Sequence, residues 1–204
     1  MALTYSDIDP HKKAFVFELD DVLYPAKDYY YQIYYLFANL LEYTELNNAA
    51  RTTEVMINTY TKEGEGKVFD KIVAELGVDE KYRKNLDIML LTARLPLKLL
   101  LFKNMLELMQ EVVTDRKKLF IVTNGNLQQQ LNKMRQVEWH GLESYLTCYF
   151  TEETLPKPEP DALHLLMKEH GLERRDLVMI GGGETDSLCA EACGIDYISA
   201  TQVI

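Results

Sequence analysis

The chain has 204 residues, of which 47% are apolar and 26% are charged. This balance is typical of a globular protein and excludes a disordered chain, a collagen-like repeat and a small disulfide-rich domain. The 22 Lys and Arg residues against 32 Asp and Glu give a net charge of −10. Because such a charge repels phosphate groups, we expect no nucleic-acid partner and no anionic membrane surface as partner.

The N-terminal segment, Met1–His11, contains two aspartates and no apolar run, so we expect no signal peptide. The most apolar stretch, residues 88–102, is interrupted by Arg94 and is too short to span a bilayer. Three cysteines cannot all pair and form no CxxC motif, so we interpret them as buried structural thiols. A cytoplasmic protein is therefore expected, while no sequence pattern indicates its oligomeric state. The three cysteines are Cys148, Cys189 and Cys193.

Short β-type runs and helical segments alternate through much of the chain. The runs cover residues 14–19, 118–123, 145–150, 177–181 and 195–200. The helical segments between them cover residues 127–137, 160–170 and 184–193, and a glycine follows each of the last two. This alternation predicts an α/β fold with a parallel sheet flanked by helices.

Residues 20–117 separate the first two expected strands, whereas a simple crossover needs only about a dozen residues. Segment 29–43 places apolar side chains on one helical face, namely Ile33, Leu36, Phe37, Leu40 and Leu41. Further helices are expected at 52–61, 67–76 and 81–91, and a crossover helix at 100–114. We therefore expect a core domain of residues 1–25 and 95–204, interrupted by an all-helical cap subdomain of residues 26–94.

Five tyrosines lie between Tyr29 and Tyr35. Such a helix could line a pocket or an interface. We favour the simpler interpretation that the rings pack against neighbours while their hydroxyl groups reach water.

Polar residues gather at the expected carboxyl ends of the strands, where open parallel sheets bind their ligands. They are Glu18, Asp20 and Asp21, then Thr123, Asn124 and Gly125, then Lys157, and finally the segment 181–186. Clustered carboxylates favour a hard cation such as Mg²⁺. A lysine and a hydroxyl beside that cation suit a phosphoryl group, whose oxygens need donors and positive charge.

These motifs resemble those of the haloacid dehalogenase (HAD) superfamily, in members with a small helical cap inserted after the first motif. Residues 17–25 (FELDDVLYP) are similar to the first motif, Asp-x-Asp-x-Thr/Val. Residues 121–125 resemble the second motif, residues 157–160 the third, and residues 181–186 the fourth. The Leu-Tyr-Pro ending and the cap size look most like the pyrimidine 5′-nucleotidase-like branch. The resemblance implies a Rossmann-like sheet, a hydrolase of the phosphatase or nucleotidase type, Mg²⁺ as cofactor and a small phosphorylated molecule as ligand.

The resemblance also implies a role for each matching residue. Glu18 stands at the position of the nucleophile, and Asp20 at that of the general acid/base. Glu18, Asp20 and Asp186 would contact the metal ion. The residues implied to bind the phosphoryl group are Thr123, Asn124, Gly125 and Lys157.

Two positions depart from the family pattern, because Glu18 replaces the nucleophilic Asp and Gly182 replaces an acidic metal ligand. The extra methylene of Glu18 moves its carboxylate by about 1.5 Å, and a misplacement of ~1 Å can cost about 10²-fold in rate. We interpret Glu184 as favouring the start of a helix rather than as a replacement ligand.

The motifs and these departures leave three functional hypotheses. We favour a catalytically impaired protein, a pseudoenzyme, that binds a phosphorylated small molecule or partner. The alternative is an active Mg²⁺-dependent phosphomonoester hydrolase in which Glu18 acts in place of Asp. A phospho-receiver domain fits poorly, because a long helical segment follows the first strand and no Asp ends the third.

Overall fold

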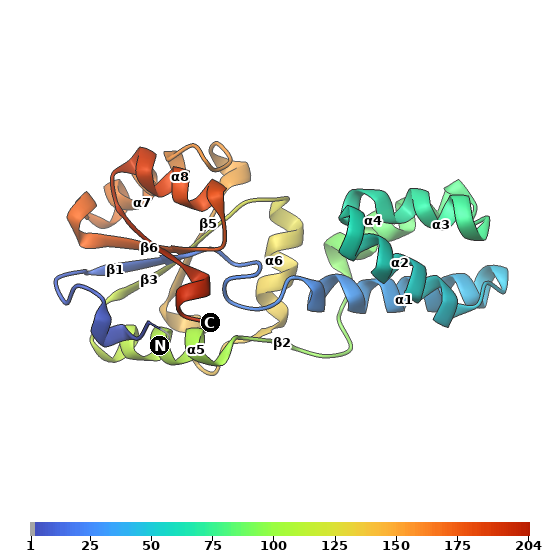
Figure 1. Ribbon diagram of the computed structural model, residues 1–204, viewed down its shortest axis with the longest axis horizontal. Helices are drawn as coiled ribbons and strands as arrows, with labels where there is room; N and C mark the ends of the chain where they lie inside the picture. Colours follow the sequence, from blue (N-terminus) through green and yellow to red (C-terminus); the bar gives the residue numbers. More distant parts are fainter. Residues whose placement is uncertain (1–2) are drawn as a thin grey trace. The chain divides into compact units, whose positions relative to one another are not determined.

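The computed structural model describes residues 3–204, and Figure 1 shows its helices and strands. The chain divides into two compact units. The first, which we call the core unit, comprises Met1–Ala26 and Leu99–Ile204, and the second, the cap unit, comprises Lys27–Lys98. In the part of the chain that is described, no helix has the length and apolar character needed to cross a membrane.

The core unit is built on a five-stranded parallel sheet with the strand order β5-β3-β1-β6-β7. The strands are β1 (Ala14–Phe17), β3 (Lys118–Thr123), β5 (Leu146–Phe150), β6 (Leu177–Gly181) and β7 (Asp196–Ser199). Every residue of β1 and β6 is buried, as expected of central strands covered on both faces. The five strands predicted from the sequence are thereby confirmed.

Four α-helices flank this sheet: α5 (Lys103–Thr114), α6 (Leu127–Gln136), α7 (Asp161–His170) and α8 (Glu184–Cys193). Helices α7 and α8 cover one face, and α5 lies on the opposite face (Figure 1). The glycines predicted to stop α7 and α8, Gly171 and Gly194, adopt left-handed conformations with φ of 62° and 73°. The parallel sheet flanked by helices agrees with the predicted fold class.

Several short elements were not predicted. Strands β2 (Leu99–Leu100) and β4 (Val137–Glu138) pair in parallel as a separate two-stranded sheet. The expected crossover helix at 100–114 therefore begins only at Lys103. Two-residue strands are too short to carry a recognisable periodicity. Single 3₁₀ turns occur at Tyr5–Asp7, Glu65–Lys67, Glu80–Tyr82, Glu143–Tyr145, Thr151–Glu153, Arg174–Asp176 and Ala200–Gln202.

The cap unit consists of the helices α1 (Lys27–Glu45), α2 (Ala49–Glu63), α3 (Val68–Leu76) and α4 (Arg83–Thr92). Its core includes Ile33, Phe37 and Leu41 of α1, which are fully buried. Leu36 and Leu40, predicted on the same face, are only half-buried. The four predicted helices are confirmed, with ends that differ by a few residues.

The tyrosines of α1 are more deeply buried than we expected. Tyr29 is buried and its hydroxyl donates to the Leu90 carbonyl oxygen at 2.5 Å. Tyr34 is also buried, and its hydroxyl oxygen has no hydrogen-bond partner in the described structure. Burial raises the pKa of Tyr34. Among the tyrosines of α1, only Tyr35 and Tyr43 are mostly exposed. The expectation that the hydroxyl groups reach water therefore does not hold for all of these tyrosines.

The three cysteines are free thiols. Cys189 and Cys193 are buried, and Cys148 is half-buried. Burial raises the pKa of both Cys148 and Cys189 to about 11, so these thiols stay protonated at neutral pH. The predicted burial is confirmed for Cys189 and Cys193 and is wrong for Cys148, which is only half-buried.

Gly181, the last residue of β6, is closely surrounded. A Cβ atom there would lie 2.4 Å from Asp186 Cβ and 2.8 Å from Tyr197 Cε2. We expect Gly181→Ala to lower the free energy of unfolding by about 1–3 kcal/mol through overpacking. Urea unfolding monitored by circular dichroism measures this loss. Gly183→Ala is the matched control, because a Cβ at Gly183 meets nothing within 4 Å; an equal loss in both variants would contradict overpacking as the cause.

Candidate functional site

The carboxyl ends of β1, β3 and β6 lie side by side and bring the predicted residues together. Phe17, the last residue of β1, is in register with Ile121 of β3 and Ile180 of β6. Glu18 therefore leaves the sheet beside Thr123 and Gly181. The structure confirms that these strand ends share one edge of the sheet.

The Glu18 side chain is almost completely enclosed by donors. Its Oε1 atom accepts hydrogen bonds from Thr123 Oγ1 at 2.5 Å and from the Leu19 backbone N–H at 2.9 Å. Its Oε2 atom pairs with the Lys157 ammonium. Glu18 is 9% exposed. Both oxygens of the group at the nucleophile position thus already hold a protein partner.

Lys157 links the acidic groups of β1 and α8. Besides Glu18, its Nζ atom contacts Asp186 Oδ1 at 2.5 Å and the Val122 carbonyl oxygen at 3.2 Å. The three contacts match the three N–H donors of an ammonium group. Burial lowers the pKa of Lys157, and the Asp186 carboxylate opposes that shift.

Asp186, in the first turn of α8, and Asn124, in the loop after β3, hold this arrangement in place. Asp186 lies in the first turn of α8, and its Oδ2 atom accepts the Gly182 backbone N–H at 2.8 Å. Asn124 Oδ1 accepts the Lys157 backbone N–H at 3.0 Å and the Thr151 hydroxyl at 2.9 Å. The Asn124 side chain therefore positions the loop that carries Lys157. Gly125 adopts φ +114°, a conformation that favours glycine at this turn.

Asp20 belongs to a neighbouring set of contacts. Its Oδ1 atom accepts the Tyr24 hydroxyl at 2.6 Å. Its Oδ2 atom accepts Lys133 Nζ at 2.5 Å and Gln130 Nε2 at 3.2 Å. Gln130 Nε2 also lies 2.7 Å from Thr123 Oγ1, so this amide joins the Asp20 contacts to the Glu18 contacts.

Sequence reasoning missed Tyr24, Gln130 and Lys133 as members of this site. Lys133 is only 2% exposed. Its burial is unexpected because α6 turns a polar face inward, whereas periodicity assigns polar faces to solvent. The available signal was the i, i+3 spacing of Gln130 and Lys133, which places both side chains on one helical face.

The acids implied as Mg²⁺ ligands are not arranged around a common cation. Glu18 and Asp186 both pair with Lys157, whereas Asp20 pairs with Lys133. Among residues 3–204, no three or more His, Cys, Asp or Glu side chains are grouped so that they could hold a metal ion. Because each of the six carboxylate oxygens accepts from a protein donor, the residues as placed do not fit a bound Mg²⁺.

Mg²⁺ at millimolar concentration is therefore expected to stabilise the wild-type protein by less than about 0.5 kcal/mol, because only a ligand present well above its Kd shifts the folding equilibrium. Thermal melts with Mg²⁺ and with EDTA measure this effect. A rise of several degrees with Mg²⁺ would contradict the expectation and would favour a metal-binding site.

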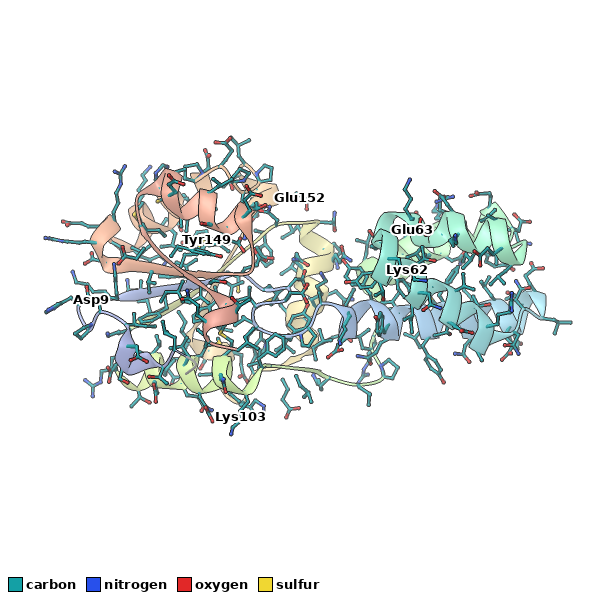
Figure 2. All side chains as sticks on the ribbon, in the orientation of Figure 1. Asp9, Lys62, Glu63, Lys103, Tyr149 and Glu152 are labelled. Atoms are coloured by element: carbon teal, nitrogen blue, oxygen red, sulfur yellow. The ribbon has the colours of Figure 1, made fainter. Side chains whose placement is uncertain are left out.

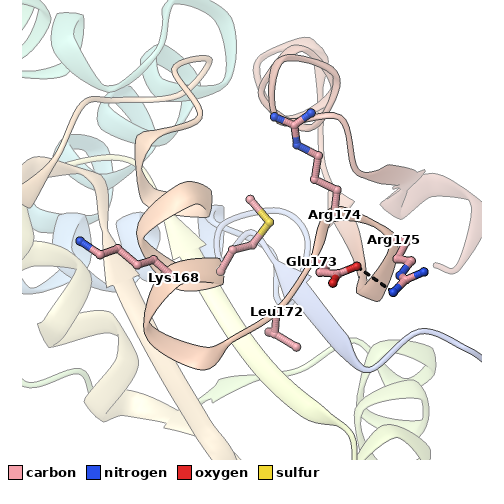
Figure 3. Close-up of a pocket in the computed structure, with 6 residues that line it drawn as sticks. Lys168, Leu172, Glu173, Arg174 and Arg175 are labelled. Atoms are coloured by element: carbon pink, nitrogen blue, oxygen red, sulfur yellow. Dashed lines mark ion pairs between the residues drawn. The ribbon is translucent and has the colours of Figure 1, made fainter.

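A hollow of about 530 Å³ lies away from these residues (Figure 3). It is lined by Met167, Lys168, Leu172, Glu173, Arg174 and Arg175. Glu173 and Arg175 form an ion pair at 2.9 Å. The turn Arg174–Asp176 directly precedes β6, so this hollow lies at the amino end of that strand, opposite the site of Glu18. None of the predicted site residues lines it.

A parallel sheet with acidic groups and a lysine at its strand ends, and a helical unit inserted after the first strand, is the arrangement that the resemblance to phosphatase-like HAD hydrolases predicts. The family model for haloacid dehalogenase-like hydrolases matches residues 15–200, and the chain belongs to this family.

Known proteins share part of the sequence or the fold of this chain. A phosphoglycolate phosphatase from Photobacterium profundum is 36% identical over 67 residues, which cover 32% of this chain and 29% of that protein. The matched stretch is thus less than a third of the relative's length. A HAD-superfamily hydrolase of subfamily IA, variant 1, from Geobacter sulfurreducens PCA has a similar structure, with a TM-score of 0.54, 19% identity and coverage of 93% and 87% of the two chains. A haloacid dehalogenase-like family hydrolase from Xanthomonas campestris gives a TM-score of 0.57 at 16% identity, covering 93% and 81%.

Proposed function

We propose that this chain is a phosphatase-like HAD protein that binds a phosphorylated small molecule or partner and has little hydrolytic activity. The observation that carries the proposal is the Glu18 carboxylate. Lys157, Thr123 and the Leu19 backbone hold both of its oxygens. A nucleophile must instead present one oxygen toward the phosphorus atom at about 3–3.5 Å.

Two further features support impaired hydrolysis. The longer side chain of Glu18 moves its carboxylate by about 1.5 Å relative to an aspartate at the same Cα position. Gly182 brings no carboxylate to the loop between β6 and α8, although its backbone N–H is held by Asp186. Both changes act on the reacting centre, whereas Thr123 and Lys157 keep the hydroxyl and ammonium that suit phosphoryl oxygens.

The relative from Photobacterium profundum is a phosphoglycolate phosphatase. By analogy with it, we propose a small phosphorylated molecule as the ligand of this chain. The net charge of −10 disfavours a nucleic acid as the phosphorylated partner. The narrower likeness to pyrimidine 5′-nucleotidases, the cytoplasmic location and the cap boundaries at residues 26 and 94 stay predictions.

The wild-type protein tests this proposal directly. Turnover of para-nitrophenyl phosphate with Mg²⁺ is expected to stay close to the rate of a protein-free blank. The control is Glu18→Gln, which keeps the side-chain length and removes the charge. Rapid turnover by the wild type that disappears in Glu18→Gln would overturn the proposal and establish the alternative, a Mg²⁺-dependent hydrolase that uses Glu18.

A further inference from the structure

Lys133 is a buried cation at this site that none of the four sequence motifs contains. It projects from α6, is 2% exposed, and its Nζ atom lies 2.5 Å from Asp20 Oδ2. Burying an ammonium group is costly, so a lysine persists in such a place only with a close anionic partner. The Lys133 ammonium group therefore lies directly beside the Asp20 carboxylate.

Lys133 changes the charge of the whole site. The carboxylates of Glu18, Asp20 and Asp186 face the two ammonium groups of Lys133 and Lys157, which leaves one net negative charge. With Lys157 as the only cation, the three carboxylates would leave two negative charges, so the Lys133 ammonium lowers the net negative charge of the site by one.

We propose that Lys133, together with Lys157, supplies the positive charge for a phosphoryl group at this site, so that the ligand binds without a divalent metal ion. This inference rests on the proposed function, because it assumes that the strand-end site binds a phosphorylated ligand. Lys133 is a binding residue in this scheme, and no bond is formed or broken.

The contacts around Asp20 do not all depend on Lys133. Asp20 Oδ1 is anchored separately by the Tyr24 hydroxyl at 2.6 Å, so the carboxylate stays in place if the lysine leaves Oδ2. Gln130 Nε2 contacts both Asp20 Oδ2 and Thr123 Oγ1. Asp20 Oδ2 and the Gln130 amide group thus connect Lys133 to the Thr123 hydroxyl, the group implied to hold phosphoryl oxygens.

Calorimetric titration with inorganic phosphate and with tungstate, in EDTA and again in Mg²⁺, tests the proposal. We expect the wild type to bind both anions in EDTA, with less than about a threefold change in affinity on adding Mg²⁺. Lys133→Met is expected to weaken binding by about tenfold or more, the effect of losing one hydrogen bond to a charged group. Asp20→Asn is expected to strengthen binding, because it removes the anion that competes for Lys133.

Opposite effects of the two variants separate binding from a general loss of stability. If Lys133→Met does not fold because Asp20 loses its cation, the Asp20→Asn, Lys133→Met double variant removes both charges, and its affinity compared with that of Asp20→Asn measures the contribution of Lys133. The matched control is Lys103→Met, since the Lys103 side chain on α5 is 85% exposed and points away from the sheet (Figure 2).

Each other outcome has a definite meaning. Binding that requires Mg²⁺, or equal affinity in the wild type and Lys133→Met, would overturn the role of Lys133 and leave the proposed function standing. Absence of phosphate and tungstate binding in both EDTA and Mg²⁺ would overturn the proposed function and this inference together.

Discussion

The double variant Glu18→Asp, Gly182→Asp is expected to hydrolyse para-nitrophenyl phosphate in the presence of Mg²⁺ at least ~100-fold faster than the wild type. Shortening residue 18 withdraws its carboxylate by about one C–C bond from the contacts that hold it. A shift of that size alone can change the reaction rate by about 10²-fold. The second substitution adds a carboxylate to the loop before α8, which raises the negative charge available to a hard cation.

The structure can accommodate both substitutions. Gly182 does not have a positive φ, so an L-residue fits its backbone. A Cβ atom at this position would lie 3.2 Å from Val22 Cγ2, and a movement of a few tenths of an ångström relieves that contact. Glu18→Asp removes volume and introduces no clash.

The single variants and a third substitution provide the controls. Each single substitution is expected to recover less activity than the pair, because the nucleophile and the cation act on the same step. Asp20→Asn added to the double variant should return the rate toward the blank if Asp20 is the general acid/base. Equal rates for the wild type and the double variant would contradict the impairment hypothesis.

Lys157→Met is expected to lower the free energy of unfolding of the core unit by about 3–5 kcal/mol. The substitution leaves the Glu18 and Asp186 carboxylates buried side by side without their shared cation. Removing one partner of a buried ion pair costs this much because the remaining charge stays uncompensated. Trp139 is the single tryptophan, lies in the core unit and is nearly buried, so its fluorescence during urea unfolding measures the loss.

The double variant Glu18→Gln, Lys157→Met separates the effect of the unpaired charge on stability from the effect of lost packing. Because the double variant has one buried carboxylate fewer, it is expected to recover part of the stability lost in Lys157→Met. Lys103→Met, on the exposed side of α5, should change stability by less than about 0.5 kcal/mol. A loss in Lys157→Met no larger than in this control would show that the buried ion pairs contribute little.

The fold was largely predictable because its elements carry strong local signals. Strands β3 and β6 and helix α8 have the predicted ends. Each is a compact apolar run or a helix closed by a glycine, patterns that depend little on distant residues. The β2 and β4 pairing was not predictable, since two residues in a strand acquire their conformation from each other across the fold.

The site was predictable only for residues that follow strands. The carboxyl ends of parallel strands meet, so the convergence of Glu18, Thr123 and Lys157 follows from strand order alone. Lys133 and Gln130 come from the side of a helix, and their burial depends on how α6 packs. The i, i+3 spacing of these two residues shows that they share a helical face, but it does not show that this polar face is buried, which is why both were missed.

The interrupted sequence of the core unit has a consequence for biosynthesis. Strand β1 occupies the centre of the sheet, yet its first partner, β3, begins only at Lys118 and its second, β6, at Leu177. While the ribosome is still extending the chain, β1 has both edges unpaired, whereas the helices of the intervening segment can form from neighbouring residues. Such long-range pairing slows folding and exposes strand edges to aggregation. The nascent chain therefore cannot pair both edges of β1 until β6 has emerged.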